Sequence, residues 1–129
     1  MEGGLTENQL VSILHNNESV SWGVAGLIRS AGFSVWVFQS AEEFLSSGQM
    51  PRTACLVIDA LLPGMGGLQL QSHLAAAGRH IPMVFIVALS NETARTDALK
   101  LGAVNVLEPL GKEALLKEIR RILKPPEMF

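Results

Sequence analysis

Short runs of apolar, largely β-branched residues recur along the chain, and longer amphipathic stretches separate them. About 20 to 30 residues lie between the starts of successive runs, which leaves room for one helix and two turns each time. The third and fourth runs are almost continuously hydrophobic, as is typical of central strands covered on both faces. The pattern predicts strands at 10–14, 33–38, 54–58, 83–89 and 104–107.

The stretches between these runs have the period of amphipathic helices. Val20, Val24 and Ile28 fall on one face of the first of them. Ser40 precedes the second as an N-cap, and Glu43 occupies the capping-box position. The predicted helices fall within 19–32, 41–48, 68–78, 92–102 and 112–123.

Strict alternation of strands and helices predicts parallel strands joined by right-handed crossovers. The expected fold is therefore α/β, a doubly wound, five-stranded parallel sheet with helices on both faces. We expect one domain over residues 10–124, a tail at 1–9, and a tail or the start of a linker at 125–129.

Composition narrows the function classes. The chain is 48% hydrophobic and only 17% charged, which supports a folded core. Its net charge is −2 and its basic residues are scattered, so we expect no direct binding of nucleic acid by this domain. The longest apolar run has about eight residues, against roughly 20 for a membrane span. A lone cysteine, Cys55, and a polar, acidic N-terminus favour a cytoplasmic protein without disulfides.

Candidate chemistry lies at the carboxyl ends of the strands, where doubly wound sheets bind ligands. His15, Asn16 and Asn17 follow the first predicted strand, and Asp59 follows the third. Asp59 has two interpretations that the local pattern leaves open. It is either a polar group that accepts hydrogen bonds from turn amides, or a nucleophilic carboxylate or metal ligand.

Motifs of familiar enzymes are missing from the sequence. Gln69 stands where the glycine-rich turn after Asp59 would need the last glycine of G-x-G-x-x-G. His15, Asp59 and Ser90 resemble a hydrolase triad in residue type only, since Ser90 lacks the G-x-S-x-G turn. His73 and the other histidines do not have metal-ligand spacing. We therefore expect a protein that is not an enzyme.

The segments "IDALLPGMGGLQL" around Asp59, "IPMVFIVAL" and "LKLGAVNVLEP" resemble the receiver domain of two-component response regulators. The resemblance runs from Leu10 to about Leu123 and is strongest to receivers attached to LuxR-type DNA-binding domains. It implies a flavodoxin-like fold, with Asp59 at the position of the phosphoacceptor. In that family an acidic pair after the first strand helps this aspartate hold Mg²⁺. A Ser or Thr and a Lys bind the phosphoryl oxygens, and an aromatic residue in the fifth strand rotates.

The other positions of the family's site carry different residues here. His15 and Asn16 stand at the positions of the acidic pair, and Asn17 follows them. Val87 stands at the position of the hydroxyl residue, Pro109 at that of the lysine, and Val106 at that of the switch aromatic. Lys112 follows shortly, but it begins the last predicted helix. Loss of one preorganised electrostatic group costs about 10²–10³ in rate, so little phosphoryl transfer is expected. We expect no cofactor, no resident metal and little binding of Mg²⁺.

The leading hypothesis is an atypical, phosphorylation-independent receiver that acts as a protein-interaction or dimerisation module. It would control transcription through an attached or partner DNA-binding domain. The expected contact surface for a second copy or a partner is the fourth helix, fifth strand and fifth helix, at about 93–101, 104–107 and 112–123. One alternative is a receiver still phosphorylated on Asp59 by a histidine kinase. Another is a flavodoxin-like domain that senses a small molecule through His15, Asn16 and Asp59.

Overall fold

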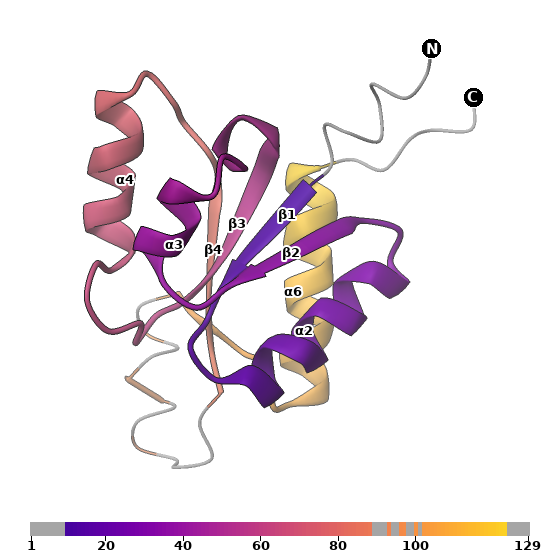
Figure 1. Ribbon diagram of the computed structural model, residues 1–129. Helices are drawn as coiled ribbons and strands as arrows, with labels where there is room; N and C mark the ends of the chain where they lie inside the picture. The colour runs from indigo at the N-terminus through magenta and orange to yellow at the C-terminus, as the bar shows by residue number, and fades with distance from the viewer. Residues whose placement is uncertain (1–9, 89–92, 94–95, 98–99, 101, 124–129) are drawn as a thin grey trace.

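The computed structural model describes residues 10–88, 93, 96–97, 100 and 102–123, and this part of the chain contains a five-stranded parallel sheet (Figure 1). The strand order is β2-β1-β3-β4-β5. This order confirms the predicted doubly wound architecture. The strands are β1 (Leu10–Leu14), β2 (Ser34–Phe38), β3 (Thr53–Asp59), β4 (Met83–Val87) and β5 (Val104–Asn105).

Helices cover both faces of the sheet, as Figure 1 shows. One face carries α2 and α6, and the other carries α3 and α4. Most of the helix predicted over 92–102 lies outside the described residues. The described helices are α2 (Glu18–Ser30), α3 (Ala41–Ser46), α4 (Gly67–Ala76) and α6 (Pro109–Ile122), and a 3-10 turn, η1 (Met50–Arg52), precedes β3.

The core consists of two apolar layers, one on each side of the sheet. Alternation along each strand divides its side chains between them. Ile13 packs with Ile28 and Ile119 on the side of α2 and α6, whereas Leu14 packs with Phe44 on the side of α3 and α4. All five residues of β1 are buried, including Ser12, whose hydroxyl is hydrogen-bonded to that of Thr53 at 2.7 Å.

Local hydrogen bonds explain where two of the helices begin. Asn17 caps α2 by accepting from the Val20 N–H at 3.1 Å. The predicted capping residue Ser40 accepts from the Glu43 N–H at 3.0 Å, and Oε1 of Glu43 accepts from the Gln39 N–H at 2.6 Å. These bonds satisfy amides that the first helical turn leaves without partners. The predicted start of α3 is confirmed, whereas α2 begins at Glu18, one residue before the predicted range.

The boundary between β5 and α6 differs from the prediction. The strand was expected to reach residue 107 and the helix to begin at 112, but β5 ends at Asn105 and α6 begins at Pro109. Oδ1 of Asn105 accepts from the Leu107 N–H at 3.1 Å and turns the chain. Proline suits the first position of a helix because it needs no donor there. In the same way β4 ends at Val87, short of the predicted 89.

Burial governs the chemistry of Cys55 in β3. Its side chain is fully buried, and burial raises the pKa of the thiol to about 12, with a smaller contribution from Glu118. Cys55 therefore packs as a small apolar side chain rather than as a nucleophile. Across the described residues, no helix is both long and apolar enough to cross a membrane.

Candidate functional site

The carboxyl ends of β1 and β3 bring the two most distinctive polar side chains together. β1 pairs with β3 in parallel, with Leu14 opposite Ile58, so His15 and Asp59 emerge side by side. The chain leaves β1 toward β2 on one side and leaves β3 toward β4 on the other. This is the switch point at which doubly wound sheets place their ligand sites.

Asp59 is the last residue of β3 and is 8% exposed. Its Oδ1 atom accepts a hydrogen bond from the Leu61 N–H at 3.0 Å, in the turn that follows the strand. Of the two interpretations left open by the sequence, the hydrogen bond to a turn amide is present in the structure. Its second oxygen, Oδ2, lies 3.6 Å from Nε2 of His15.

His15 is buried beside Asp59 with a defined ring orientation. It is 5% exposed, and its Nδ1 atom accepts from the Asn17 N–H at 3.0 Å. A ring nitrogen that accepts carries no proton, so the proton of the neutral imidazole is on Nε2, which lies toward Asp59. At 3.6 Å the contact is longer than a hydrogen bond and acts electrostatically.

Burial and the neighbouring carboxylate act on His15 in opposite directions. Burial lowers the pKa of the imidazole below its usual value, and the charge of Asp59 opposes this shift without reversing it. His15 is therefore neutral at pH 7. Histidine titrates near neutral pH when its pKa is unperturbed, and Asp59 is the charged neighbour of this one. Burial moves the titration away from neutral pH.

The residues present do not fit the Mg²⁺ ion that a receiver site holds. Mg²⁺ requires hard oxygen ligands in near-octahedral geometry, and here an N–H donor lies against the carboxylate. Asn16 and Asn17 are exposed, and the side chain of Asn17 caps α2. Within the described ranges, no group of three or more His, Cys, Asp or Glu side chains could hold a metal.

The other matched positions offer no group that could bind a phosphoryl oxygen. Val87 is fully buried at the end of β4, and Pro109 begins α6 with its side chain exposed. Val106 is buried in the layer under α2 and α6. Ser90, the third residue of the formal triad, lies outside the described residues. Asn105 is buried, and its oxygen is engaged by the Leu107 N–H.

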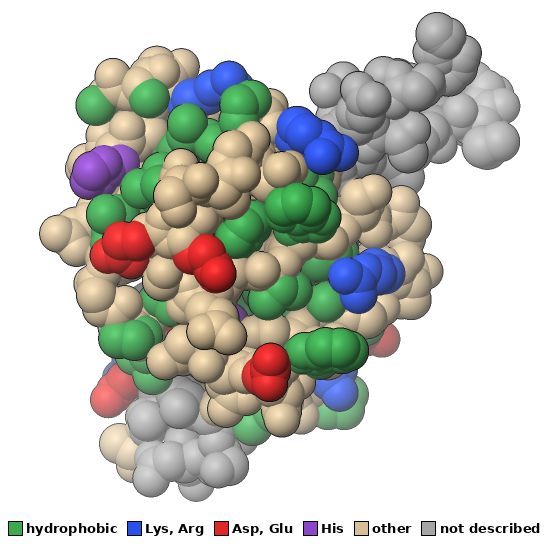
Figure 2. Space-filling model, in the orientation of Figure 1, with side chains coloured by type: hydrophobic (Ala, Val, Ile, Leu, Met, Phe, Trp, Pro, Cys, Tyr) green, Lys and Arg blue, Asp and Glu red, His purple; other side chains and the backbone are tan. Residues whose placement is uncertain are grey.

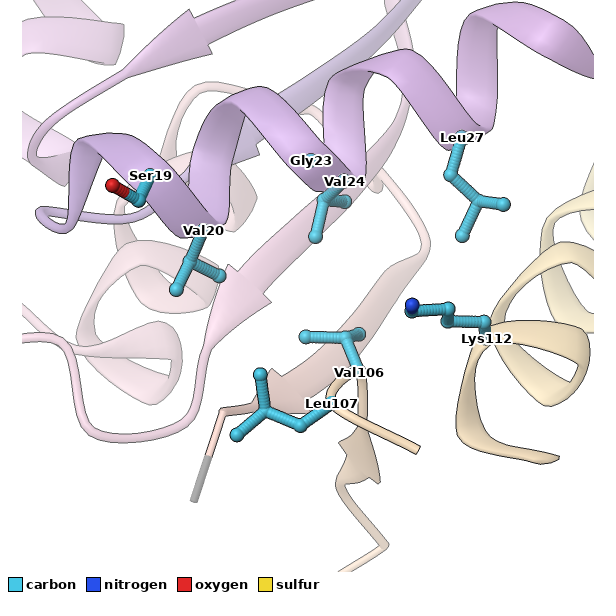
Figure 3. Close-up of a pocket in the computed structure, with 8 residues that line it drawn as sticks. All are labelled: Ser19, Val20, Gly23, Val24, Leu27, Val106, Leu107 and Lys112. Atoms are coloured by element: carbon cyan, nitrogen blue, oxygen red, sulfur yellow. The ribbon is translucent and has the colours of Figure 1, made fainter. Parts of the chain in front are cut away.

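Lys112 does not replace the missing lysine. As predicted, it belongs to the last helix and not to the end of β5. Its ammonium group points toward Leu27 and Val106, across a groove of about 280 Å³ between α2 and the β5–α6 connection (Figure 3). The groove also contains Gly23 and Leu107. Lys112 therefore lies among the residues that line the α2 side of the sheet.

The sequence placed His15 and Asp59 at the same edge of the sheet and indicated that the acidic pair was missing, but it did not predict direct contact between the imidazole and the carboxylate. The adjacency of parallel strand ends was the signal that could have revealed it. Equal register at the ends of β1 and β3 places residue 15 next to residue 59.

Residues 11–120 match the family model described as the response regulator receiver domain. The chain belongs to this family. It is 36% identical to Nodulation protein W of Bradyrhizobium diazoefficiens over 122 residues, which are 92% of this chain and 54% of that protein. It is 35% identical to the response regulator protein TodT of Pseudomonas putida over 116 residues, which cover 89% of this chain and 51% of TodT. The receiver thus spans about half the length of these curated relatives.

Solved structures agree with this assignment. The response regulator StyR superposes with a TM-score of 0.66 at 37% identity, covering 89% of this chain and 59% of StyR. The FixJ-N crystal structure superposes with a TM-score of 0.63 at 27% identity, covering 93% of this chain and 97% of FixJ-N. Receiver domains are generally signalling domains of regulators that control transcription. They interact with histidine kinases and often dimerise.

Proposed function

We propose that this chain is an atypical receiver that signals through protein contacts without phosphorylation of Asp59. The observation that carries the proposal is the placement of His15, whose Nε2 lies 3.6 Å from Oδ2 of Asp59. A neutral N–H donor takes the side of the carboxylate where a receiver needs acidic ligands. The proposed site has Asp59 as phosphoacceptor equivalent, no metal and no cofactor.

Three further side-chain groups that a phosphoryl switch uses are missing from the matched positions of this chain. Val87 has no hydroxyl and Pro109 has no ammonium to bind phosphoryl oxygens. Val106 has no aromatic ring that could rotate. A phosphoryl group adds a charge of about −1.5 to −2, which reorganises a loop only where cationic or hydroxyl partners pair with it. Charge added at Asp59 would therefore have no means of transmission to β5 and α6.

The proposed contact surface comprises residues 93–101, β5 with its following turn, and α6. Two large apolar side chains of this surface are exposed, Leu107 at 51% and Leu110 at 78%. Either a second copy or a partner protein would cover them. Because the curated relatives are about twice as long, we propose that a DNA-binding domain of LuxR type, attached or on a partner, executes the transcriptional output.

Incubation with acetyl phosphate and Mg²⁺ tests the proposal. We expect intact-mass spectrometry to find no phosphoryl group on Asp59, because the donor set neither binds Mg²⁺ nor stabilises the transferring group. Efficient, Mg²⁺-dependent labelling of Asp59 would contradict the proposal and favour the alternative of a receiver phosphorylated by a histidine kinase.

A repaired variant supplies the matched control. It combines His15→Asp, Asn16→Asp, Val87→Thr and Pro109→Lys, and restores every ionic and hydroxyl group of the family's site. We expect this variant to be labelled, and we expect Asp59→Asn in the same background to abolish the label. The small-molecule alternative makes a separate prediction, namely ligand-dependent thermal stabilisation that His15→Gln removes.

A further inference from the structure

Both tryptophans of the chain lie on the surface, at the free edge of the sheet. Trp22 of α2 is 73% exposed and Trp36 of β2 is 47% exposed. Both residues border a cleft of about 290 Å³ where α2 meets β2, which Arg29 and three small or branched side chains also line. Because side chains alternate along β2, the ring of Trp36 lies on the same face as Phe38, toward α3, whereas Trp22 lies on the α2 face. Figure 2 views the molecule from this side, with hydrophobic side chains at the surface over β2 and α2. Exposed tryptophan beside arginine is the composition of interaction hot spots.

The edge strand itself lacks the usual protection against pairing. β2 bonds to β1 on one side, and no described strand pairs with its outer side. Exposed edges are normally protected by charges, proline, bulges or short length. Residues 31–41 contain no charged residue and no proline, and β2 is five residues long. The opposite edge strand, β5, is protected by its two-residue length.

We propose that a second copy of this chain docks on β2 and α2 across a two-fold axis, with the two β2 strands paired antiparallel. This surface is distinct from the β5–α6 surface of the proposed function and does not depend on it.

The occupant follows from the self-complementary layout of the edge. In an isologous interface each element must map onto itself. Val35, Trp36 and Val37 of β2 border the cleft, with Trp36 in the middle. The α2 residues that border it lie on either side of Ala25 in the sequence. A single two-fold axis through the cleft can therefore relate both β2 and α2 to their copies. It pairs Trp36 with its own copy, and Val35 with Val37 of the second copy, as cross-strand neighbours.

The outward stripe of α2 fits the same axis. Trp22, Gly26 and Arg29 follow one another at helical spacing. No atom lies within 4 Å of the position where Gly26 would carry a side chain, so two antiparallel helices can approach closely there. Arg29, the charged residue lining the cleft, then meets Trp22 of the second copy in a cation–π contact. The positive charge of Arg29 therefore needs no carboxylate from a different partner protein.

The exposed side chains of this edge supply part of the area that a dimer interface buries. A covered tryptophan side chain buries about 150–250 Å², and a standard interface buries about 800 Å² per partner. Two tryptophans, the exposed Val37 and the backbone of a five-residue strand supply a large part of this area. Unpaired backbone groups on the outer side of β2 would at the same time gain hydrogen-bond partners.

Sedimentation equilibrium of the 129-residue chain tests this interface, with tryptophan fluorescence as a second readout. We expect a monomer–dimer equilibrium within the range of about 1 µM to 1 mM in which weak dimers dissociate. Because both tryptophans lie in the interface, their emission should shift to shorter wavelength as the dimer forms. Trp36→Lys and Trp22→Ala should each raise the dissociation constant by more than about tenfold.

Leu68→Lys is the matched control, since Leu68 is 77% exposed on α4, away from the edge, and should leave the dimer unchanged. Leu110→Lys reports on the β5–α6 surface. A protein that stays monomeric over the whole range overturns the inference. It is also overturned by a dimer that survives both tryptophan variants or that is lost on Leu110→Lys alone. If Trp36→Lys fails to fold by circular dichroism, Trp22→Ala decides the question.

Discussion

His15 and Asp59 determine what the strand ends can do chemically. The same backbone site that gives other receivers a cluster of oxygen ligands here holds an imidazole N–H against a single carboxylate. Residue types alone predicted the loss of the acidic pair. They did not predict how the ring of His15 is oriented, because the backbone amide of Asn17 donates to Nδ1 while the side chain of Asn17 caps α2.

The pH dependence of stability follows from the lowered pKa of His15. As pH falls below about 6.5, the unfolded chain takes up the proton before the folded one, so the free energy of unfolding decreases with falling pH. We expect this decrease between about pH 7 and pH 5 to be smaller in His15→Gln. Urea denaturation at several pH values measures it, and equal slopes for both proteins would contradict the assignment.

NMR titration of the imidazole gives an independent check on the same pair. Asp59 opposes the effect of burial, so Asp59→Asn should lower the pKa of His15 further. A pKa that stays the same or rises in this variant would mean that the carboxylate does not act on the ring.

At the scale of elements, sequence pattern placed the strands and helices well where local hydrogen bonds decide their ends. The Ser40 cap at the start of α3 is an example. The predicted β5–α6 boundary was wrong because the side chain of Asn105 turns the chain after the strand and the first turn of α6 then packs against β5. Gly111 lies so close to the backbone of β5 that a methyl group there would collide with the carbonyl of Asn105. The periodicity of hydrophobic residues cannot predict that the first turn of a helix packs this closely against a strand.

Two glycines in helices should therefore respond oppositely to the same substitution. Gly111→Ala should destabilise the protein by about 1–3 kcal/mol, because the backbone of α6 must move away from β5. Gly23→Ala should stabilise it by about 0.5–1 kcal/mol, because the space around Gly23 is open and alanine favours the helix. Urea denaturation of both variants measures the difference, and effects of the same sign would contradict the packing described for α6.

For the whole molecule, alternating strands and helices were enough to predict the doubly wound sheet. The strand order and the family match confirm it. Surface function was harder to foresee. Trp22 and Trp36 belong to different predicted elements, and only the packing of α2 beside β2 brings both to the same edge of the sheet. An edge strand is likewise defined by the order of the sheet rather than by its own residues.

The central claim is that Asp59 is not a phosphoryl switch. Titration with beryllofluoride and Mg²⁺, followed by backbone amide NMR, tests it most directly because beryllofluoride mimics the phosphoryl group without requiring its transfer. We expect the amide signals around Asp59, Val87 and Val106 to stay in place, while the repaired variant responds. Saturable, Mg²⁺-dependent shifts at Asp59 in the unmodified chain, extending to β5 and α6, would contradict the claim.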